Sequence, residues 1–360
     1  MNEQTPLAEI HRSAGANLAP HFGVALPEQF ADPLSEDRAA REHAALLDTN
    51  FRAIFSLAGP DRVRYLNAVL TSNIRDLAPG QGTIGLLLNP QGHILAELET
   101  FTLEDRIVIF SHAFVREKTF ATLDKFIIMD DATLADETDA SGTLAIEGPD
   151  APAVLASLTG VDLTAHQPYG HVAATLTTST GAIPCRTIIR SLFGLPGAEL
   201  LVAREHLALA WNTVNAAVRA KGGAPIGYRA YNILRLEAGV PWFGADFDER
   251  QIPHEAALER SHISYTKGCY TGQEIVERVR SRGHVNRRRT ALAFSGTEPP
   301  QAGATLASAG AEAGHVTSAA FSPRAGKPIG MGYVKRENTQ AGAQLQCGDF
   351  EAQVIELPLP

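Results

Sequence analysis

Cys269 lies in the run KGCYTGQE at residues 267–274. The residue types of this run best suit a catalytic or metal-binding thiol. Thr271 and Glu274 have the S/T-x-x-E spacing of a capping box, which predicts that a helix begins there. The positive potential of a helix N-terminus, together with the charge of Lys267, favours the thiolate form of a nearby cysteine. Cys269 and Lys267 are therefore candidate catalytic residues, and Cys269 is also a candidate metal ligand.

The alternative for Cys269 is a buried position in which the thiol packs as a small apolar group, the commoner environment of a free cysteine. Gly268 and Gly272 favour a functional site, because glycine permits tight turns and the close approach of backbone to a ligand. The chain has three cysteines and no C-x-x-C pair, whereas an iron–sulfur cluster normally takes four cysteine ligands. A cluster at Cys269 would therefore be transient and shared with a partner, and the thiol would have to open onto a pocket.

A second candidate segment, YNILRLEAGVPWFGADFD at residues 231–248, begins like a helix and breaks at Gly239. Trp242 and Phe243 can stack on a flat heterocycle, and Glu237 can hydrogen-bond its ring nitrogens. The alternative is that both aromatic side chains belong to an ordinary core, and composition alone favours that alternative.

A basic segment follows the KGCYTGQE run in a chain whose net charge is -9. Clustered arginines can bind carboxylates or phosphates through two parallel hydrogen bonds, which suits a ligand with a carboxylate tail or an acidic partner. A solvated helix face explains the same pattern equally well. The six arginines are Arg278, Arg280, Arg282, Arg287, Arg288 and Arg289.

An internal repeat defines the elements that must position these residues. Residues 52–61 and 143–150 alternate like half-buried strands and end in Gly-Pro-Asp, and a helical pattern follows each. The Asp of each tripeptide is predicted to cap its helix. Two further strands and a helix follow in both copies, with the helices near 114–128 and 204–220. Strand-helix-strand-strand-helix occurring twice predicts two related α+β modules.

The remainder of the chain differs from this repeat. Short strands separated by Gly and Pro after residue 286 predict a small all-β barrel. With 360 residues, 44% of them hydrophobic and 20% charged, the chain should form two or three ordered domains.

Charge and hydropathy exclude several classes of protein. A net charge of -9 argues against a general nucleic-acid or anionic-membrane binder. We find neither a run of the roughly 18 apolar residues that a membrane helix needs nor a secretory signal. The sequence therefore predicts a cytoplasmic protein with no membrane and no direct nucleic-acid partner.

Several motifs resemble a known family. KGCYTGQE, with VxRxxxRGxVxRR at residues 276–288, resembles the signature of the YgfZ-type folate-binding proteins, which support iron–sulfur cluster assembly. LRLEAGVPWFGADF resembles the segment that lines the folate site in the wider aminomethyltransferase (glycine cleavage T-protein) superfamily. HVTSAAFSP followed by IGMGYV resembles the C-terminal barrel of that superfamily. The likeness runs from about residue 45 to the end.

The resemblance implies an α+β fold in which two related ferredoxin-like modules and a C-terminal β-barrel form a ring around a central funnel. The expected parts are an N-terminal segment 1–45, a first module 46–135, a second module 136–286 with both motifs, and the barrel 287–360.

The resemblance also implies a ligand and partners. The ligand would be tetrahydrofolate or a one-carbon derivative of it. The partners would be A-type iron–sulfur scaffold proteins and 4Fe–4S client enzymes, whose clusters the protein would help to assemble or repair through Cys269 and Lys267. The candidate folate-binding residues are Glu237, Trp242, Tyr270, Gly272, Gln273, Glu274 and Arg278.

One departure separates this chain from the true aminomethyltransferases. Those enzymes carry a segment that resembles ILDDL, whereas the corresponding residues 94–98 of this chain are Ile-Leu-Ala96-Glu97-Leu. The loss of a positioned carboxylate argues against their chemistry, because such a group contributes about 10²–10⁴-fold in rate. The leading hypothesis is therefore folate binding without classical enzyme catalysis. Glu97 keeps open the alternative of a folate-dependent one-carbon transferase, and a scaffold without a ligand is the third alternative.

Overall fold

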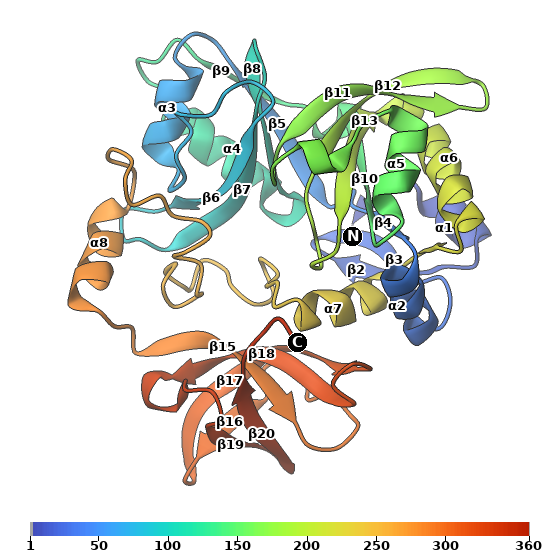
Figure 1. Cartoon of the computed structure of the whole chain (residues 1–360). Helices are drawn as coiled ribbons and strands as arrows, with labels where there is room; N and C mark the ends of the chain where they lie inside the picture. The colour runs from blue at the N-terminus through green and yellow to red at the C-terminus, as the bar shows by residue number, and fades with distance from the viewer. Residues whose placement is uncertain (1–2, 360) are drawn as a thin grey trace. The chain divides into compact units, whose positions relative to one another are not determined.

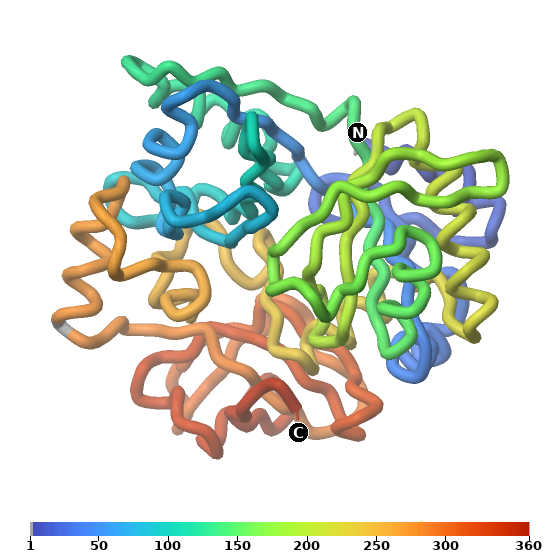
Figure 2. The backbone as a smooth tube through the Cα atoms, turned by 45° about the horizontal axis from the view of Figure 1, so that its top comes forward, coloured from blue at the N-terminus to red at the C-terminus, as the bar shows by residue number. Residues whose placement is uncertain are grey.

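The structure is a computed structural model that describes residues 3–359, except for the side chain of Arg282. The chain divides into two compact units. The first comprises Met1–Asn67, Asn73–Ile84 and Leu98–Tyr231, and the second comprises Ala68–Ser72, Gly85–Glu97 and Asn232–Pro360. Figure 1 labels the helices and strands, and Figure 2 follows the backbone of the same chain.

Two sheets repeat the same strand order. The first has the order β6 (Gly82–Leu88), β7 (Ile94–Thr102), β8 (Arg106–His112), β5 (Arg52–Ala58) and β9 (Thr133–Asp136). The second has the order β11 (His171–Thr178), β12 (Gly181–Ile189), β13 (Gly197–Ala203), β10 (Ser141–Glu147), β4 (Ala45–Asp48) and β14 (Ala224–Pro225). The first five positions correspond strand for strand, so the repeat predicted from the sequence is confirmed.

The fifth strand of each sheet comes from the other half of the repeat. Strand β4 directly precedes β5 in the chain, yet it pairs antiparallel with β10, where Leu144 lies opposite Asp48. Strand β9 directly precedes β10, yet it pairs with β5, where Phe55 lies opposite Asp136. The two modules thus exchange one strand with each other.

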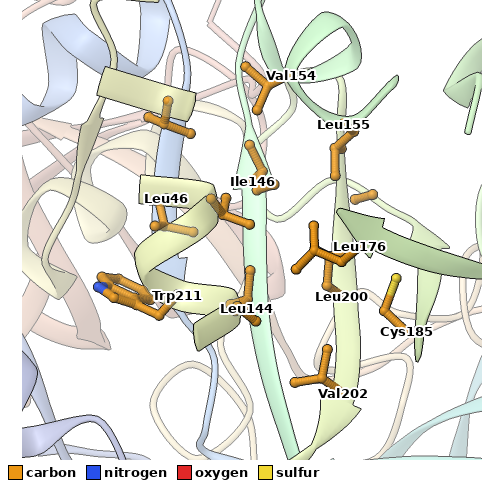
Figure 3. Packing of buried hydrophobic residues seen from close by; sticks show 14 of the residues in the cluster. Leu46, Leu144, Ile146, Val154, Leu155, Leu176, Cys185, Leu200, Val202 and Trp211 are labelled. Atoms are coloured by element: carbon orange, nitrogen blue, oxygen red, sulfur yellow. The ribbon is translucent and has the colours of Figure 1, made fainter. Parts of the chain in front are cut away.

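Helices α5 (Ala151–Thr159) and α6 (Leu207–Ala220) pack on the sheet that contains β10 (Figure 1). Their apolar side chains meet Leu144 and Ile146 of β10 in one core cluster, and Figure 3 shows how these side chains point toward one another. The buried side of α6 recurs at helical spacing, which is why this segment forms an amphipathic helix. Its members are Leu207, Ala210, Trp211, Val214 and Val218.

A ring of four buried charges lies inside the first unit. Arg52 is 3.2 Å from Glu99 and 3.3 Å from Glu199, and Arg190 is 2.7 Å from Glu99 and 2.9 Å from Glu199. Glu99 belongs to β7 and Glu199 to β13, so the ring joins the two sheets. Each carboxylate faces two guanidinium groups, which offsets the cost of burying it.

The remaining elements of the first unit flank the two sheets. A small sheet has the order β1 (Glu3–Gln4), β3 (Val24–Gln29) and β2 (Asn17–His21). His11 lies 2.7 Å from Asp48, with both side chains fully buried. Burial alone would raise the pKa of Asp48. The hydrogen bond and the charge of His11, with hydrogen bonds from the Thr5 hydroxyl and the Asn50 backbone, together hold this pKa below its ordinary value. The other helices are α1 (Ala8–Ser13), α2 (Pro33–Glu42), α3 (Arg62–Val69) and α4 (Arg116–Lys125).

A closed six-stranded barrel forms the C-terminal part of the second unit. Closure leaves the barrel without an unpaired edge strand. Its order is β15 (Arg287–Phe294), β18 (Lys327–Lys335), β17 (Ala311–Ser322), β16 (Thr305–Ser308), β19 (Gln344–Cys347) and β20 (Phe350–Ile355). The other helices of this unit are α7 (Tyr228–Glu237), which begins in the first unit, and α8 (Gln273–Arg282).

These elements confirm the predicted mixed α+β fold with a small C-terminal barrel. The predicted caps at Gly-Pro-Asp are wrong in detail. Asp150 occupies the N-cap of α5, but its carboxylate lies 3.2 Å from His43 and makes no cap bond. Asp61 accepts from the backbone of Asp131 at 2.9 Å. Across residues 3–359, no helix is long and apolar enough to cross a membrane.

His171, on β11, makes the stability of the first unit depend on pH. Burial and the neighbouring Arg186, which donates to its Nδ1 atom at 2.8 Å, lower the pKa of His171 to about 4. The folded protein therefore favours the neutral form of His171. The contribution of this preference to the unfolding free energy is complete above the ordinary pKa near 6.5 and is lost as the pH falls toward 4. When the pH is lowered from 7.5 to 5, the unfolding free energy of the wild type should fall by about 2 kcal/mol more than that of His171→Asn.

Urea unfolding of both proteins at the two pH values measures this difference. Asparagine keeps an acceptor close to the position of Nδ1, so the comparison isolates the titration. Equal losses in the wild type and in His171→Asn would show that His171 does not titrate as its burial implies.

Candidate functional site

The KGCYTGQE segment is anchored by Lys267 within the second unit. The Nζ atom of Lys267 donates to the backbone carbonyl of Leu70 and to that of Ser72, the latter at 2.8 Å. The same ammonium lies 5.2 Å from the centre of the Tyr270 ring. The structure therefore gives Lys267 a role in holding the segment, and its predicted catalytic role stays a prediction.

Helix α8 begins at Gln273, one residue later than the capping box predicts. Its N-cap is Gly272 in the left-handed region, and no side chain caps the helix. Gln273 instead accepts from the backbone N–H of Tyr270 at 3.3 Å. Glu274 is exposed and lies 3.3 Å from Arg278. The predicted capping box of Thr271 and Glu274 is therefore wrong, because the left-handed Gly272 occupies the cap position.

Gly272 also packs against the turn that leads into β7. A Cβ atom at Gly272 would lie 2.7 Å from the carbonyl oxygen of Asn89, and one at Gly92 would lie 2.9 Å from Ile275 of α8. Both distances are too short for real side chains. The motif and the turn at residues 89–92 therefore need glycine at these two positions.

Gly272→Ala should test this packing against a matched glycine. Gly272 and Gly283, at the two ends of α8, have φ values of 81° and 86°, but a Cβ atom at Gly283 would meet open space. Both substitutions incur left-handed strain of about 1–2 kcal/mol. We expect Gly272→Ala to lower the unfolding free energy by roughly 1–3 kcal/mol more than Gly283→Ala, as overpacking does. Equal effects in urea unfolding would refute the steric contact.

Cys269 is exposed, whereas Cys185 and Cys347 are buried. The thiol is therefore not sealed among apolar side chains, and the expectation that it opens onto a pocket stays a prediction. In the part of the chain that the structure describes, no group of three His, Cys, Asp or Glu side chains is placed to hold a metal. A metal role for Cys269 stays a prediction, and it would require ligands from another molecule.

Glu97, on β7, forms a close pair with His262. Oε1 of Glu97 lies 3.0 Å from Nε2 of His262, and the two side chains are only 14% and 9% exposed. On its other side the imidazole Nδ1 atom lies 2.7 Å from Oγ of Ser261. The strand β7 thus presents a largely buried carboxylate whose orientation is set by a histidine.

Thr71 holds His262 beside Glu97. The Thr71 hydroxyl donates to the carbonyl of His262 at 2.6 Å and accepts from the backbone N–H of Leu86 at 2.8 Å. The carbonyl of Thr71 accepts from the N–H of Ser264 at 2.9 Å. The segment that carries His262 is therefore tied to the same short stretch, Ala68–Ser72, that receives Lys267.

Glu237 lies at the end of α7 and is 2% exposed. Its carboxylate accepts from the hydroxyl of Ser322 on β17, and its backbone carbonyl accepts from Leu359 at 2.9 Å. The carboxylate thus contributes to the packing of the barrel strand. A role for Glu237 in folate binding stays a prediction.

Trp242 is held by a buried ion pair. The Arg235 guanidinium lies 4.4 Å from the centre of the Trp242 ring and pairs with Asp246, and both charged side chains are fully buried. Asp246 also accepts from the Trp242 backbone N–H at 2.9 Å and from the hydroxyls of Thr317 at 2.6 Å and Ser318. One face of Trp242 is thus covered by a cation, which leaves at most one face for a ligand.

The arginines of the basic segment are divided between a helix and the barrel. Arg278 and Arg280 are exposed on α8. Four of the arginines face carboxylates, and Arg289 donates to the carbonyl of Ala256 at 2.8 Å. These contacts favour a paired, solvated surface over an open anion site. The pairs are Arg278 with Glu274, Arg280 with Glu277, Arg287 with Glu255, and Arg288 with Glu259.

Two open grooves of about 450 Å³ each lie on the barrel. Arg288 and Arg289 of the basic segment line the first groove. The walls of both grooves belong to β15, β18 and β20 with the adjoining loops. Cys269, Glu237 and Trp242 therefore lie outside these two grooves.

Sequence reasoning missed His262, Arg235 and Asp246. His262 lies 165 residues from Glu97, so no local pattern links the two. Arg235 and Asp246 both lie inside the segment singled out for Trp242, and an Arg and an Asp among apolar residues could have indicated a buried ion pair.

Comparison with known proteins covers most of the chain. A model of the GCVT N-terminal domain matches residues 7–264, and a model of the glycine cleavage T-protein C-terminal barrel domain matches residues 287–359. The aminomethyltransferase of Streptomyces coelicolor is 30% identical, over 95% of this chain and 91% of the relative. That of Chloroherpeton thalassium is 31% identical over 98% of both chains.

A vertebrate relative and a solved structure agree with these matches. The mitochondrial aminomethyltransferase of Gallus gallus is 31% identical over 95% of this chain and 88% of the relative. The crystal structure of the glycine cleavage system aminomethyltransferase T from Bartonella henselae superposes with a TM-score of 0.90, at 26% identity, over 99% of this chain and 98% of the other. The fold is therefore the same throughout.

Proposed function

Because this chain belongs to the aminomethyltransferase family of the glycine cleavage T-protein, we propose that it binds tetrahydrofolate and transfers a one-carbon unit, with Glu97 as the reacting carboxylate. The pair of Glu97 and His262 carries this proposal. It provides a carboxylate where the relatives carry paired acids, and it fixes that carboxylate in one orientation. A fixed and largely buried acid or base is what proton transfer at a folate nitrogen requires.

The proposed reaction balances without an oxidant or a reductant. An aminomethyl carbon bound to a carrier sulfur forms two bonds to tetrahydrofolate nitrogens, while its bonds to sulfur and to the amine break. Two N–H protons of tetrahydrofolate are lost, and one proton each is gained by the thiol and by the leaving ammonia. Glu97 would accept the first of these protons and return one to the leaving amine.

Two measurements on the purified protein test this function. Calorimetric titration with tetrahydrofolate should show saturable binding, and its absence would favour a scaffold without a ligand. Incubation with an aminomethylated lipoyl carrier should then form methylenetetrahydrofolate. Binding without turnover would overturn the transferase role of Glu97 and leave the folate site standing.

A second candidate function rests on the exposed thiol of Cys269. In that function the chain is a YgfZ-type protein that binds folate and supports the assembly or repair of iron–sulfur clusters with A-type scaffold proteins and 4Fe–4S client enzymes. The KGCYTGQE run favours it, and the single exposed thiol requires the partner to supply the remaining ligands.

Cys269→Ser should decide this second candidate. If the thiol takes part, cluster transfer from an A-type scaffold carrying a 2Fe–2S centre should fall by about 10-fold or more, because serine lacks the soft thiolate that iron–sulfur centres require. Anaerobic absorption spectra and the activity of a 4Fe–4S client measure the transfer. Cys347→Ala, in the barrel core, is the control. Identical spectra and client activity for Cys269→Ser and the wild type would refute the thiol role.

A further inference from the structure

Three hydrogen-bonded side chains lead from the Glu97 carboxylate to the surface of the second unit. Glu97 meets Nε2 of His262 at 3.0 Å, and Nδ1 of His262 meets Oγ of Ser261 at 2.7 Å. The side chains of Glu97 and His262 are largely buried, whereas Ser261 is exposed. The imidazole thus stands between a largely buried carboxylate and the hydroxyl of an exposed residue, which also lies 3.4 Å from the carbonyl oxygen of Leu258.

We propose that His262 relays a proton between Glu97 and solvent through Ser261. The inference rests on the proposed transfer reaction, which gives Glu97 a proton to move. A substrate that covers the exposed part of Glu97 would shield it from water, so a route through the protein becomes useful at that moment. Imidazole suits this role, because one ring nitrogen can accept a proton while the other releases one.

Each step of the relay conserves protons and breaks no bond to carbon. Protonated Glu97 gives its proton to Nε2 of His262, and Nδ1 gives its proton to Oγ of Ser261, whose own proton passes to water. The reverse sequence returns a proton to Glu97 for the leaving amine, and it restores the starting tautomer of His262. No oxidation state changes.

The surroundings of His262 keep this geometry in place. Its backbone carbonyl accepts from Thr71, and the segment is tied again at Ser264. The Glu97 carboxylate contacts the His262 ring at 3.0 Å. A proton on either group therefore acts on the other across this contact.

Variants of His262 separate relaying a proton from orienting the carboxylate. In His262→Gln the side-chain amide can still donate to Glu97, but it cannot pass a proton onward. We expect this variant to bind tetrahydrofolate within about 3-fold of the wild type and to lose about 10²-fold in turnover. Imidazole added to His262→Ala should restore part of that turnover. The matched control is His206→Gln, a histidine of the first unit outside the site.

Two outcomes would overturn the relay. One is wild-type turnover in His262→Gln, and the other is failure of imidazole to raise the turnover of His262→Ala while the variant still binds tetrahydrofolate. If the wild type itself shows no turnover, the proposed function is wrong. Nitrogen NMR of the His262 ring then tests the coupling between His262 and Glu97 without any need for turnover. The coupling requires that Glu97→Gln shift the His262 titration curve, and an unchanged curve would refute it.

Discussion

Replacing Glu97 with glutamine is expected to lower the formation of methylenetetrahydrofolate by about 10²–10⁴-fold, the range that a positioned acid or base contributes. Glutamine keeps the size of the side chain and can still hydrogen-bond to His262, so the fold should be unaffected. It cannot accept a proton at the reacting nitrogen. Tetrahydrofolate affinity should change by no more than about 10-fold, since one hydrogen bond is altered.

Steady-state turnover and calorimetric titration of the same samples measure the two effects separately. Glu104→Gln, an exposed glutamate on the loop between β7 and β8, provides the control. If Glu97→Gln and Glu104→Gln both retained wild-type turnover, Glu97 would not be the reacting carboxylate, and the pair with His262 would have a structural role only.

Arg235→Met is expected to lower the unfolding free energy by about 3–5 kcal/mol, because removing one partner of a buried ion pair leaves an uncompensated charge. The remaining charge is Asp246, which keeps its hydrogen bonds to Trp242, Thr317 and Ser318 but loses its only guanidinium partner among the described residues. Methionine fills a similar volume, so loss of packing contributes little.

Urea unfolding followed by tryptophan fluorescence measures this loss and also reports on the site. The chain has two tryptophans, Trp242 beside Arg235 and Trp211 in the core of the first unit, so Trp211→Phe isolates the signal of Trp242. The double variant Arg235→Met/Asp246→Leu should recover much of the lost stability, because no buried charge remains. A loss below about 1 kcal/mol in the single variant would show that Asp246 reaches water.

The repeat and the barrel were predictable because each element carries a local signal. Gly and Pro mark the turns, and the apolar stripe of α6 recurs at helical spacing. The strand at residues 52–58 was predicted to be half-buried, but six of its residues in succession are buried. The exchange of β4 and β9 leaves no such signal, since short strands pair equally well with many partners. The predicted domain boundaries and the ring arrangement stay predictions.

The candidate site was predictable only where it is continuous in sequence. The motif around Cys269 stood out, and the exposure of its thiol agrees with the expectation. The capping box failed, because a spacing rule does not show that Gly272 would adopt a left-handed conformation. Glu97 was noticed as a departure from relatives, but its partner His262 depends on tertiary contacts through Thr71.

The exchange of edge strands also determines when this protein can begin to fold during synthesis. Strand β4 leaves the ribosome early, but its partner β10 is made roughly 100 residues later, so β4 must wait as an unpaired apolar segment. All five strands of the first sheet, β5 to β9, are made before β10 emerges. The first sheet can therefore form while β4 still lacks β10, and a nascent chain stalled before residue 141 would expose β4 to chaperones and proteases.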